Sequence, residues 1–511
     1  MRALTHGSGI VMNRSHGNGR IRNSSRDFGV RQYRARLGRK NTANFLFFMA
    51  SLLFAGAFIF IGFSTNFLFA FIFLFLALST FFIFVKNQVL LFLIFLVFMF
   101  PVPVSIGIIH ITPMDIMLLM MLLSVLYQGA VSKGFEYPPG VYLTAGALFV
   151  LSVILSTLAA ANIFTAFPEI IQFTYFTLII PFVVMNIAKD SRQILSVLKF
   201  LSALLVAQAV LVIVQFYMIL NGNTAIREAF RYANRGGESG QFLRSYGSVG
   251  PAVGIFFAVG VCIMLVVLFR NRSTIMEKTA SFTGVLMLLY ANSCSGLRSG
   301  LGIIAVIIPS LALMKRRYVL SLALIMVIAA AILGGMTVGR EIYPFKLYYE
   351  HGGFRETDIA DAMNQFKQKP LLGFGPQQFI RERIGTHPTG AENEMVRRLV
   401  EGGIVGGAVF VFWCAAPLFM AGRAALFARS SDVRNAGLIL LAAFLVFVIN
   451  GFAVADLFEG GHGHLMLVIL GFILVVDKEY KMSRSDTKSR VSGEHHDGTH
   501  AGSAAVPRSA Q

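Results

Sequence analysis

Apolar residues dominate the chain in long runs that short polar segments interrupt. A helix needs roughly 20 consecutive apolar residues to cross a bilayer. Because the bilayer interior offers no partner to an open backbone, each run is predicted to be a transmembrane helix. The pattern predicts an all-α polytopic membrane protein with about 14 spans (12–14), at residues 45–63, 66–85, 89–109, 113–127, 141–160, 169–187, 199–220, 250–269, 280–294, 299–314, 318–337, 402–421, 436–455 and 464–476.

The charges of the short loops alternate along the chain. The short loops near 64–65, 110–112 and 161–168 contain no Lys or Arg, whereas the loops between them do. Cytoplasmic loops of membrane proteins carry an excess of these residues. We therefore expect an even number of spans and both termini in the cytoplasm. The loops predicted to face the cytoplasm carry Lys86, Lys133, Lys189, Arg192, Arg270, Arg272, Lys278, Lys315, Arg316, Arg317, Arg423, Arg429 and Arg434.

Two polar tails and one long outward loop complete the predicted organisation. The N-terminal tail holds ten Lys/Arg against the single acid Asp27, which suits a segment beside anionic lipid. The C-terminal tail is rich in Ser, Gly, His and Lys, and we expect it to be disordered. The predicted segments are a basic cytoplasmic tail (1–43), transmembrane helices 1–11 (44–337), a large outward loop (338–401), transmembrane helices 12–14 (402–476) and a disordered cytoplasmic tail (477–511).

Composition narrows the class of protein further. Of the 511 residues, 56% are hydrophobic and 14% charged, against about 25% charged in soluble domains. This excludes a soluble globule and a disordered chain. The net charge of +19 comes without a folded basic module, so we expect no nucleic-acid partner. Three cysteines, all in or beside apolar runs, fit neither a disulfide framework nor a metal site.

The long outward loop is predicted to be partly ordered. Ile359, Ala362, Met363 and Phe366 recur at helical spacing, which predicts an amphipathic helix over residues 357–369. In this prediction Thr357 caps the helix and Pro370 ends it. A second helix is expected from Glu394 to Glu401. The first helix is interpreted either as a lid on the membrane surface or as an inert surface helix.

Several segments predicted to face outward contain arginines, and their presence needs an explanation because the short outward loops are otherwise poor in basic residues. Arg244 lies in the segment 221–245, Arg298 in the turn Ser295–Gly300 and Arg355 in the long loop. They either solvate their loops or build an anion site together. The planar fork of a guanidinium group matches phosphate oxygens, which favours a phosphate or diphosphate as the anion.

The C-terminal half carries the segment Lys369–Pro376, with Gly373 and Gly375, followed by Asn393, Gly403 and Gly406. These motifs resemble those of the O-antigen ligase and O-antigen polymerase superfamily of bacterial inner-membrane proteins. The segment Lys369–Pro376 is similar to the family's "PLLGxGp" stretch. Asn393, Gly403 and Gly406 match the spacing of its "HNxxLxxLxExGxxG" segment. Arg298 and Arg244 lie in stretches similar to its "SRsg" and "RxxGtfxnPn" elements, and Pro113-Met-Asp115 resembles an early "pxD" step. The chain departs from the ligase pattern by having Glu392 in place of the histidine, which favours polymerase-like and looser members of the superfamily.

The resemblance implies an enzyme that transfers or polymerises glycan from an undecaprenyl-diphosphate carrier on the periplasmic face, for O-antigen or exopolysaccharide synthesis. Its implied partners are this lipid-linked oligosaccharide, a glycan or lipid acceptor, the bilayer and other membrane proteins of polysaccharide assembly. Arg244, Arg298 and Arg355 would stabilise the departing diphosphate without metal or cofactor. Glu392 or His387 would accept the proton of the attacking hydroxyl, with Glu392 preferred because it occupies the matched position. The alternatives are that Glu392 only caps the following helix and that His387-Pro388 is an ordinary turn.

Two other polar sites and two other functions compete with this interpretation. His462-Gly-His464 is predicted to be a polar turn and not a metal site, since two histidines two residues apart lack a third ligand. Asp115, at the entrance of a predicted span, is either functional or simply reaches the interface. A glycan transporter or flippase is the alternative function. It would require polar groups deep within several spans and two similar halves. A sensor or scaffold would leave the outward arginines unexplained.

Overall fold

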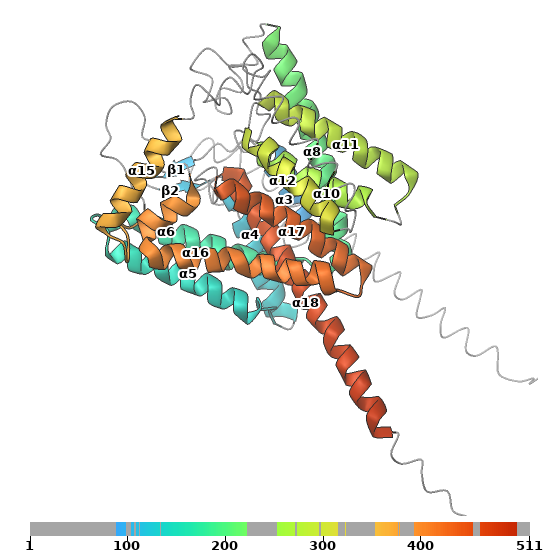
Figure 1. The fold of residues 1–511 in the computed structure, drawn as a ribbon. Helices are drawn as coiled ribbons and strands as arrows, with labels where there is room; N and C mark the ends of the chain where they lie inside the picture. The colour runs from blue at the N-terminus through green and yellow to red at the C-terminus, as the bar shows by residue number, and fades with distance from the viewer. Residues whose placement is uncertain are drawn as a thin grey trace, which may run out of the picture. The chain divides into compact units, whose positions relative to one another are not determined.

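The computed structural model describes residues 88–98, 104–106, 109–111, 113–132, 134–221, 253–270, 273–295, 298–314, 353–376, 378, 393–452 and 460–497, together with positions 322 and 326. Almost all of these residues are helical (Figure 1). The elements are α3 (Gln88–Phe98), β1 (Val104–Ile106), β2 (Ile109–Ile111), α4 (Pro113–Ser132), α5 (Gly140–Leu158), α6 (Ile163–Thr174), the π-helical η1 (Tyr175–Ile179), α7 (Ile180–Ile187), α8 (Ser191–Leu220), α10 (Val253–Leu268), α11 (Ile275–Ser295), α12 (Arg298–Met314), α15 (Gly353–Gln368), α16 (Glu394–Phe427), α17 (Ser431–Gly451) and α18 (Gly460–Asp497).

A helix coincides with each predicted span from 113–127 onward except 318–337, of which only two positions are described. The predicted spans 45–63 and 66–85 lie outside the described residues. Within the described part, six helical segments are long and apolar enough to cross a membrane: Met114–Val131, Gly140–Leu158, Ala166–Ile187, Ser191–Met218, Glu394–Phe427 and Ser431–Gly451. The prediction of a helical, multi-pass protein is confirmed to this extent. The count of about 14 and the side on which the termini lie stay predictions.

The predicted span 89–109 takes a different form. Helix α3 ends at Phe98, and the strands Val104–Ile106 and Ile109–Ile111 pair as a short antiparallel hairpin in which Ser105 lies opposite His110. Pro101 and Pro103 explain the difference, because proline lacks the N–H that a continuing helix requires. The fold is therefore all-α apart from this hairpin within the described part of the chain.

Two further boundaries differ from the sequence prediction. Helix α15 begins at Gly353, so Thr357 lies inside it and does not cap it as predicted; Pro370 does follow its end. The span predicted at 169–187 begins earlier, as α6, and passes through η1 into α7. Single turns of π-helix inside α-helices frequently mark functional sites.

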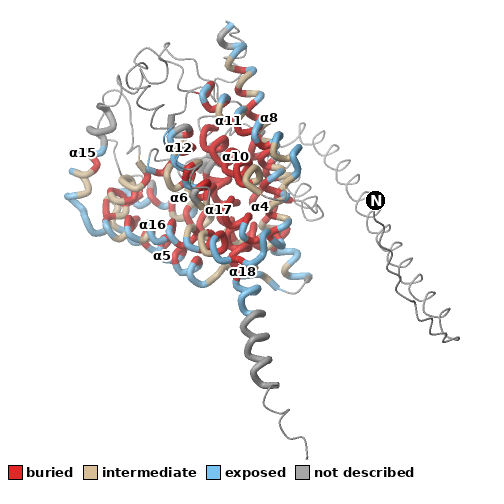
Figure 2. The backbone as a smooth tube through the Cα atoms, turned by 45° about the vertical axis from the view of Figure 1, so that its right-hand side comes forward, coloured by how far each residue is buried: buried red, intermediate tan, exposed pale blue. Residues whose placement is uncertain are grey.

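The helices pack through aromatic rings and small residues. Trp413 of α16, the single tryptophan, stacks on Phe149 of α5 with ring centroids 5.7 Å apart, and Phe173 of α6 meets Phe149 edge-on at 5.4 Å. A Cβ atom on Gly437 of α17 would come within 2.8 Å of the backbone nitrogen of Ala425 in α16. Glycine thus lets α16 and α17 approach closely, as is common between membrane helices. Figure 2 shows α10 and α17 buried along most of their length.

Ion pairs connect the loops at one end of the helices. Asp432, in the first turn of α17, lies 3.2 Å from Arg192 of α8 and 3.5 Å from Arg270 after α10. Lys478 of α18 lies 2.6 Å from Glu136 in the loop before α5. These contacts join loops that the charge pattern assigned to one side of the membrane. The candidate site lies at the opposite ends of the helices.

Candidate functional site at the kink of helix α16

Helix α16 is kinked at Gly403, whose backbone (φ 63°, ψ −166°) is not helical. The kink releases backbone groups from the helical hydrogen-bond ladder on both sides of it. The segment Pro370–Pro376 supplies new hydrogen-bond partners for these groups. Phe374 and Gly375 donate their N–H groups to the carbonyls of Val400 (3.0 Å) and Glu401 (2.9 Å). In return, Ile404 donates to the carbonyl of Pro370 at 2.8 Å.

This arrangement, which we call the clasp (residues 370–376 with 400–405), explains three of the predicted motif glycines. Gly373, Gly375 and Gly403 all have a positive φ, which side-chain-bearing residues rarely adopt. A Cβ on Gly373 would also collide with the backbone of Glu401, and one on Gly403 with the carbonyl of Leu371. Gly406 differs, because the nearest atom to its added Cβ would be the carbonyl oxygen of Arg398 at 3.6 Å, an ordinary contact. The first three glycines therefore serve the clasp, whereas nothing in the described contacts requires a glycine at 406.

Asn393 fixes the start of α16. Its Oδ1 accepts hydrogen bonds from the backbone nitrogens of Met395 (2.9 Å) and Val396 (3.2 Å), which makes it the N-cap. Its Nδ2 donates to the carbonyl of Phe452, just after α17, at 2.9 Å. The alternative reading of Glu392 as the cap is thus wrong, because the neighbouring asparagine side chain performs that role.

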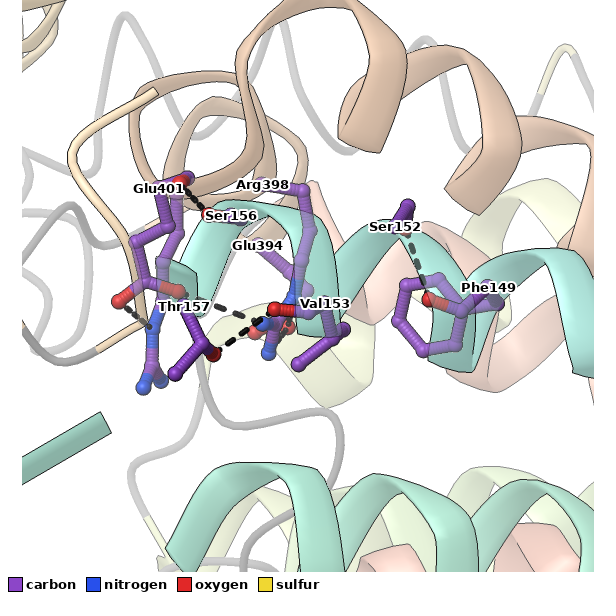
Figure 3. A network of polar contacts seen from close by, with 9 residues as sticks. Phe149, Ser152, Val153, Ser156, Thr157, Glu394, Arg398 and Glu401 are labelled. Atoms are coloured by element: carbon purple, nitrogen blue, oxygen red, sulfur yellow. Dashed lines mark hydrogen bonds and ion pairs between the residues drawn. The ribbon is translucent and has the colours of Figure 1, made fainter. Parts of the chain in front are cut away.

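Four charged side chains form a buried network in the first two turns of α16, and Figure 3 labels three of them, Glu394, Arg398 and Glu401. Arg398 donates from Nε to Oε1 of Glu394 at 2.7 Å and from Nη1 to Oε2 of Glu401 at 3.3 Å. Arg397 donates from Nε to Oε1 of Glu401 at 3.2 Å. Glu394 is only 1% exposed and Glu401 3%. Charged side chains this deeply buried must be paired, because removing each ion from water costs on the order of several kcal/mol.

The network is tied to the neighbouring helices. The hydroxyl of Ser156, in the last turns of α5, donates to the carbonyl of Glu401 (Figure 3). The guanidinium of Arg398 lies over the ring of Phe173 of α6, 4.4 Å from its centroid. The kink, the clasp and the network thus hold α5, α6 and the long loop together at one end of α16.

A pair of a histidine and a carboxylate lies near the start of α18. Nε2 of His464 lies 2.9 Å from Oδ1 of Asp115, in the first turn of α4. The ring of Phe176 in η1 meets the imidazole edge-on at 5.5 Å, and the hydroxyl of neighbouring Tyr175 donates to the carbonyl of Asp115 at 3.3 Å. The prediction of a polar turn at 462–464 is wrong: these residues are helical, and His464 is buried against α4 and η1.

The predicted diphosphate and proton-transfer residues are only partly placed. Arg298 opens helix α12 and Arg355 lies in the first turn of α15, but their side chains lie outside what the structure describes. Arg244, Glu392 and His387 lie outside the described residues. Their joint role stays a prediction. No group of three or more His, Cys, Asp or Glu side chains able to hold a metal occurs among the residues that the structure describes.

The network and the His464 pair were missed from the sequence, although one signal was available. Glu394 and Arg398 are four residues apart, and Arg398 and Glu401 three apart, so they share one face of a helix. That spacing alone does not separate a buried network from a solvated helix face. The contact between His464 and Asp115 joins residues 349 positions apart and leaves no local signal.

Comparison with known proteins gives a family for this part of the chain. Residues 279–411 match the O-antigen ligase family. The matched segment spans α11, α12, α15 and α16 beyond the Gly403 kink, so it contains the clasp and the buried network. The match confirms the resemblance to the O-antigen ligase and polymerase superfamily that the motifs indicated, and it supports an O-antigen ligase-like function. A search of curated proteins found no match to the chain.

Proposed function

We propose that this protein is a membrane glycosyltransferase that transfers or polymerises undecaprenyl-diphosphate-linked glycan units on the periplasmic face of the bacterial inner membrane. The observation that carries the proposal is the O-antigen ligase match over residues 279–411. This segment includes the family motif around Asn393 and Gly403, and in the structure those residues shape the start and the kink of α16. O-antigen or exopolysaccharide would be the product.

The proposed reaction joins a sugar hydroxyl of the acceptor to the anomeric carbon of the lipid-linked glycan. The bond from that carbon to the diphosphate oxygen breaks, and the lipid diphosphate leaves with its electron pair. Arg244, Arg298 and Arg355 stabilise the negative charge that develops there, each by an amount comparable to an oxyanion-hole donor, about 3–4 kcal/mol at most. Glu392, or alternatively His387, accepts the proton of the hydroxyl. No metal is required by this scheme.

The positions of the described charges favour an enzyme over a transporter. A glycan transporter would carry polar groups near the bilayer midplane. Asp115 and Glu394 lie instead in the first turns of α4 and α16, and His464 lies near the start of α18. Groups at helix ends can act on a substrate held at the membrane surface.

Purified protein tests the proposal directly. The protein, a lipid-diphosphate oligosaccharide and a panel of glycan acceptors should together release lipid diphosphate and form longer glycan. R244A, R298A and E392A should each abolish long glycan chains at an unchanged protein level. A protein that moved the lipid-linked glycan across vesicle membranes without releasing diphosphate would support the transporter instead.

A further inference from the structure

The buried network of α16 has one oxygen without a partner. Oε1 of Glu394 accepts from two nitrogens of Arg398, and both carboxylate oxygens of Glu401 accept from arginines. Oε2 of Glu394 is buried and has no hydrogen-bond partner. An unsatisfied buried acceptor typically costs about 1–3 kcal/mol, and more when it is charged. Such an exception in a native protein calls for an explanation, for which a bound group or an ordered water is a candidate.

The chemistry of the network limits what that group can be. Two carboxylates and two guanidinium groups balance in charge, so the network does not attract a diphosphate. An ionised carboxylate oxygen only accepts hydrogen bonds. Its partner is therefore a neutral donor, and a sugar hydroxyl is the donor that the proposed reaction supplies.

A second buried side chain, near the end of α17, also lacks hydrogen-bond partners. Asn450 is 1% exposed, and neither Oδ1 nor Nδ2 has a hydrogen-bond partner. It lies two residues before Phe452, whose carbonyl receives the hydrogen bond from Asn393, the residue before Glu394. An amide can donate and accept at once, as a sugar hydroxyl can. Two unsatisfied polar side chains thus occur where α17 ends and α16 begins.

We propose that Glu394 is a substrate-binding residue whose Oε2 accepts a hydrogen bond from a sugar hydroxyl of the glycan undergoing transfer. The assignment rests on the proposed glycosyltransferase function. It adds a glycan-binding group on α16 to the arginines proposed for the diphosphate. The glycan is either that of the acceptor or that of the lipid-linked donor, and the experiment separates the two.

The test is steady-state kinetics of the purified full-length protein with a lipid-diphosphate oligosaccharide as donor and the lipid-free oligosaccharide as acceptor. E394Q replaces the charged acceptor with a neutral amide, so any hydrogen bond to the sugar hydroxyl loses its charge assistance. A hydrogen bond to a charged group, at about 1.5–3 kcal/mol, predicts that KM rises about 10- to 150-fold for one of the two substrates, with kcat little changed. A rise in the acceptor KM identifies the acceptor glycan, and a rise in the donor KM identifies the donor glycan. E277Q, at an exposed pair with Lys199, is the matched control and should leave both values unchanged.

Thermal unfolding separates substrate binding from a structural role. E401Q removes a carboxylate whose two oxygens both bind arginines, so it should lower the unfolding temperature more than E394Q does. If E394Q fails to fold, E394D is assayed in its place, because it keeps the charge while withdrawing the oxygens by one methylene. Wild-type KM values in the folded variant would overturn the assignment and leave an ordered water as the partner of Oε2. Absence of any transfer by the wild-type protein would instead contradict the proposed function.

Discussion

Asn393 joins the beginning of one helix to the end of another: its Oδ1 caps α16, and its Nδ2 donates to the carbonyl of Phe452 after α17 at 2.9 Å. One side chain thus sets both where α16 starts and how it meets α17. The motif position that resembles the family's asparagine has a structural role that the spacing alone did not reveal.

Replacement of Asn393 tests this double role. N393A removes the cap and the link to Phe452, and loss of a cap alone costs about 0.5–2 kcal/mol. N393D keeps the capping oxygen and loses only the donor, so its unfolding temperature should fall between those of N393A and the wild type. Fluorescence of the single Trp413, buried farther along α16, reports unfolding. Equal unfolding temperatures for N393A and N393D would show that the capping contact contributes nothing.

The clasp predicts that neighbouring glycines respond differently to the same substitution. G403A places a Cβ against the carbonyl of Leu371 at a positive φ, and should destabilise the protein by more than about 1 kcal/mol. G402A is the matched control, because nothing lies within 4 Å of its added Cβ. Thermal unfolding and the yield of folded protein in detergent measure both. A G403A variant as stable as G402A would contradict the kinked conformation of α16.

Removal of Arg398 should lower the free energy of unfolding, because the buried carboxylates of the network depend on this cation. R398Q leaves Glu394 and Glu401 without their shared cation, and breaking a buried ion pair typically costs about 3–5 kcal/mol. R192Q, whose side chain is 85% exposed beside Asp432, should cost less than about 1 kcal/mol. Unfolding in denaturant compares the two variants. Similar losses would mean that the network is hydrated and not buried.

The pair between Asp115 and His464 should couple α4 to α18 energetically. D115N, H464Q and the double variant form a double-mutant cycle. For two residues in contact we expect an interaction energy of about 0.5–3 kcal/mol in the free energy of unfolding. Additive effects would show that the 2.9 Å contact does not stabilise the fold.

The sequence predicted helices well where a long apolar run or a helical spacing of apolar residues marks the segment. Apolar runs located α4 to α18, and helical spacing with Pro370 located α15 to within a few residues. Contacts between distant segments were not predictable. The clasp consists of backbone hydrogen bonds, which leave no trace in the sequence beyond their glycines. The turn predicted at His462-Gly-His464 was wrong because local composition does not reveal the packing of His464 against Phe176 of η1.

Purified wild-type and R298A protein, each given a lipid-diphosphate oligosaccharide and its lipid-free acceptor, test the central claim most directly. The account predicts that the wild type releases lipid diphosphate in step with glycan lengthening, and that R298A loses this release by about 10²-fold or more while remaining folded. Release by R298A at the wild-type rate, or no release by the wild type with any acceptor, would contradict it.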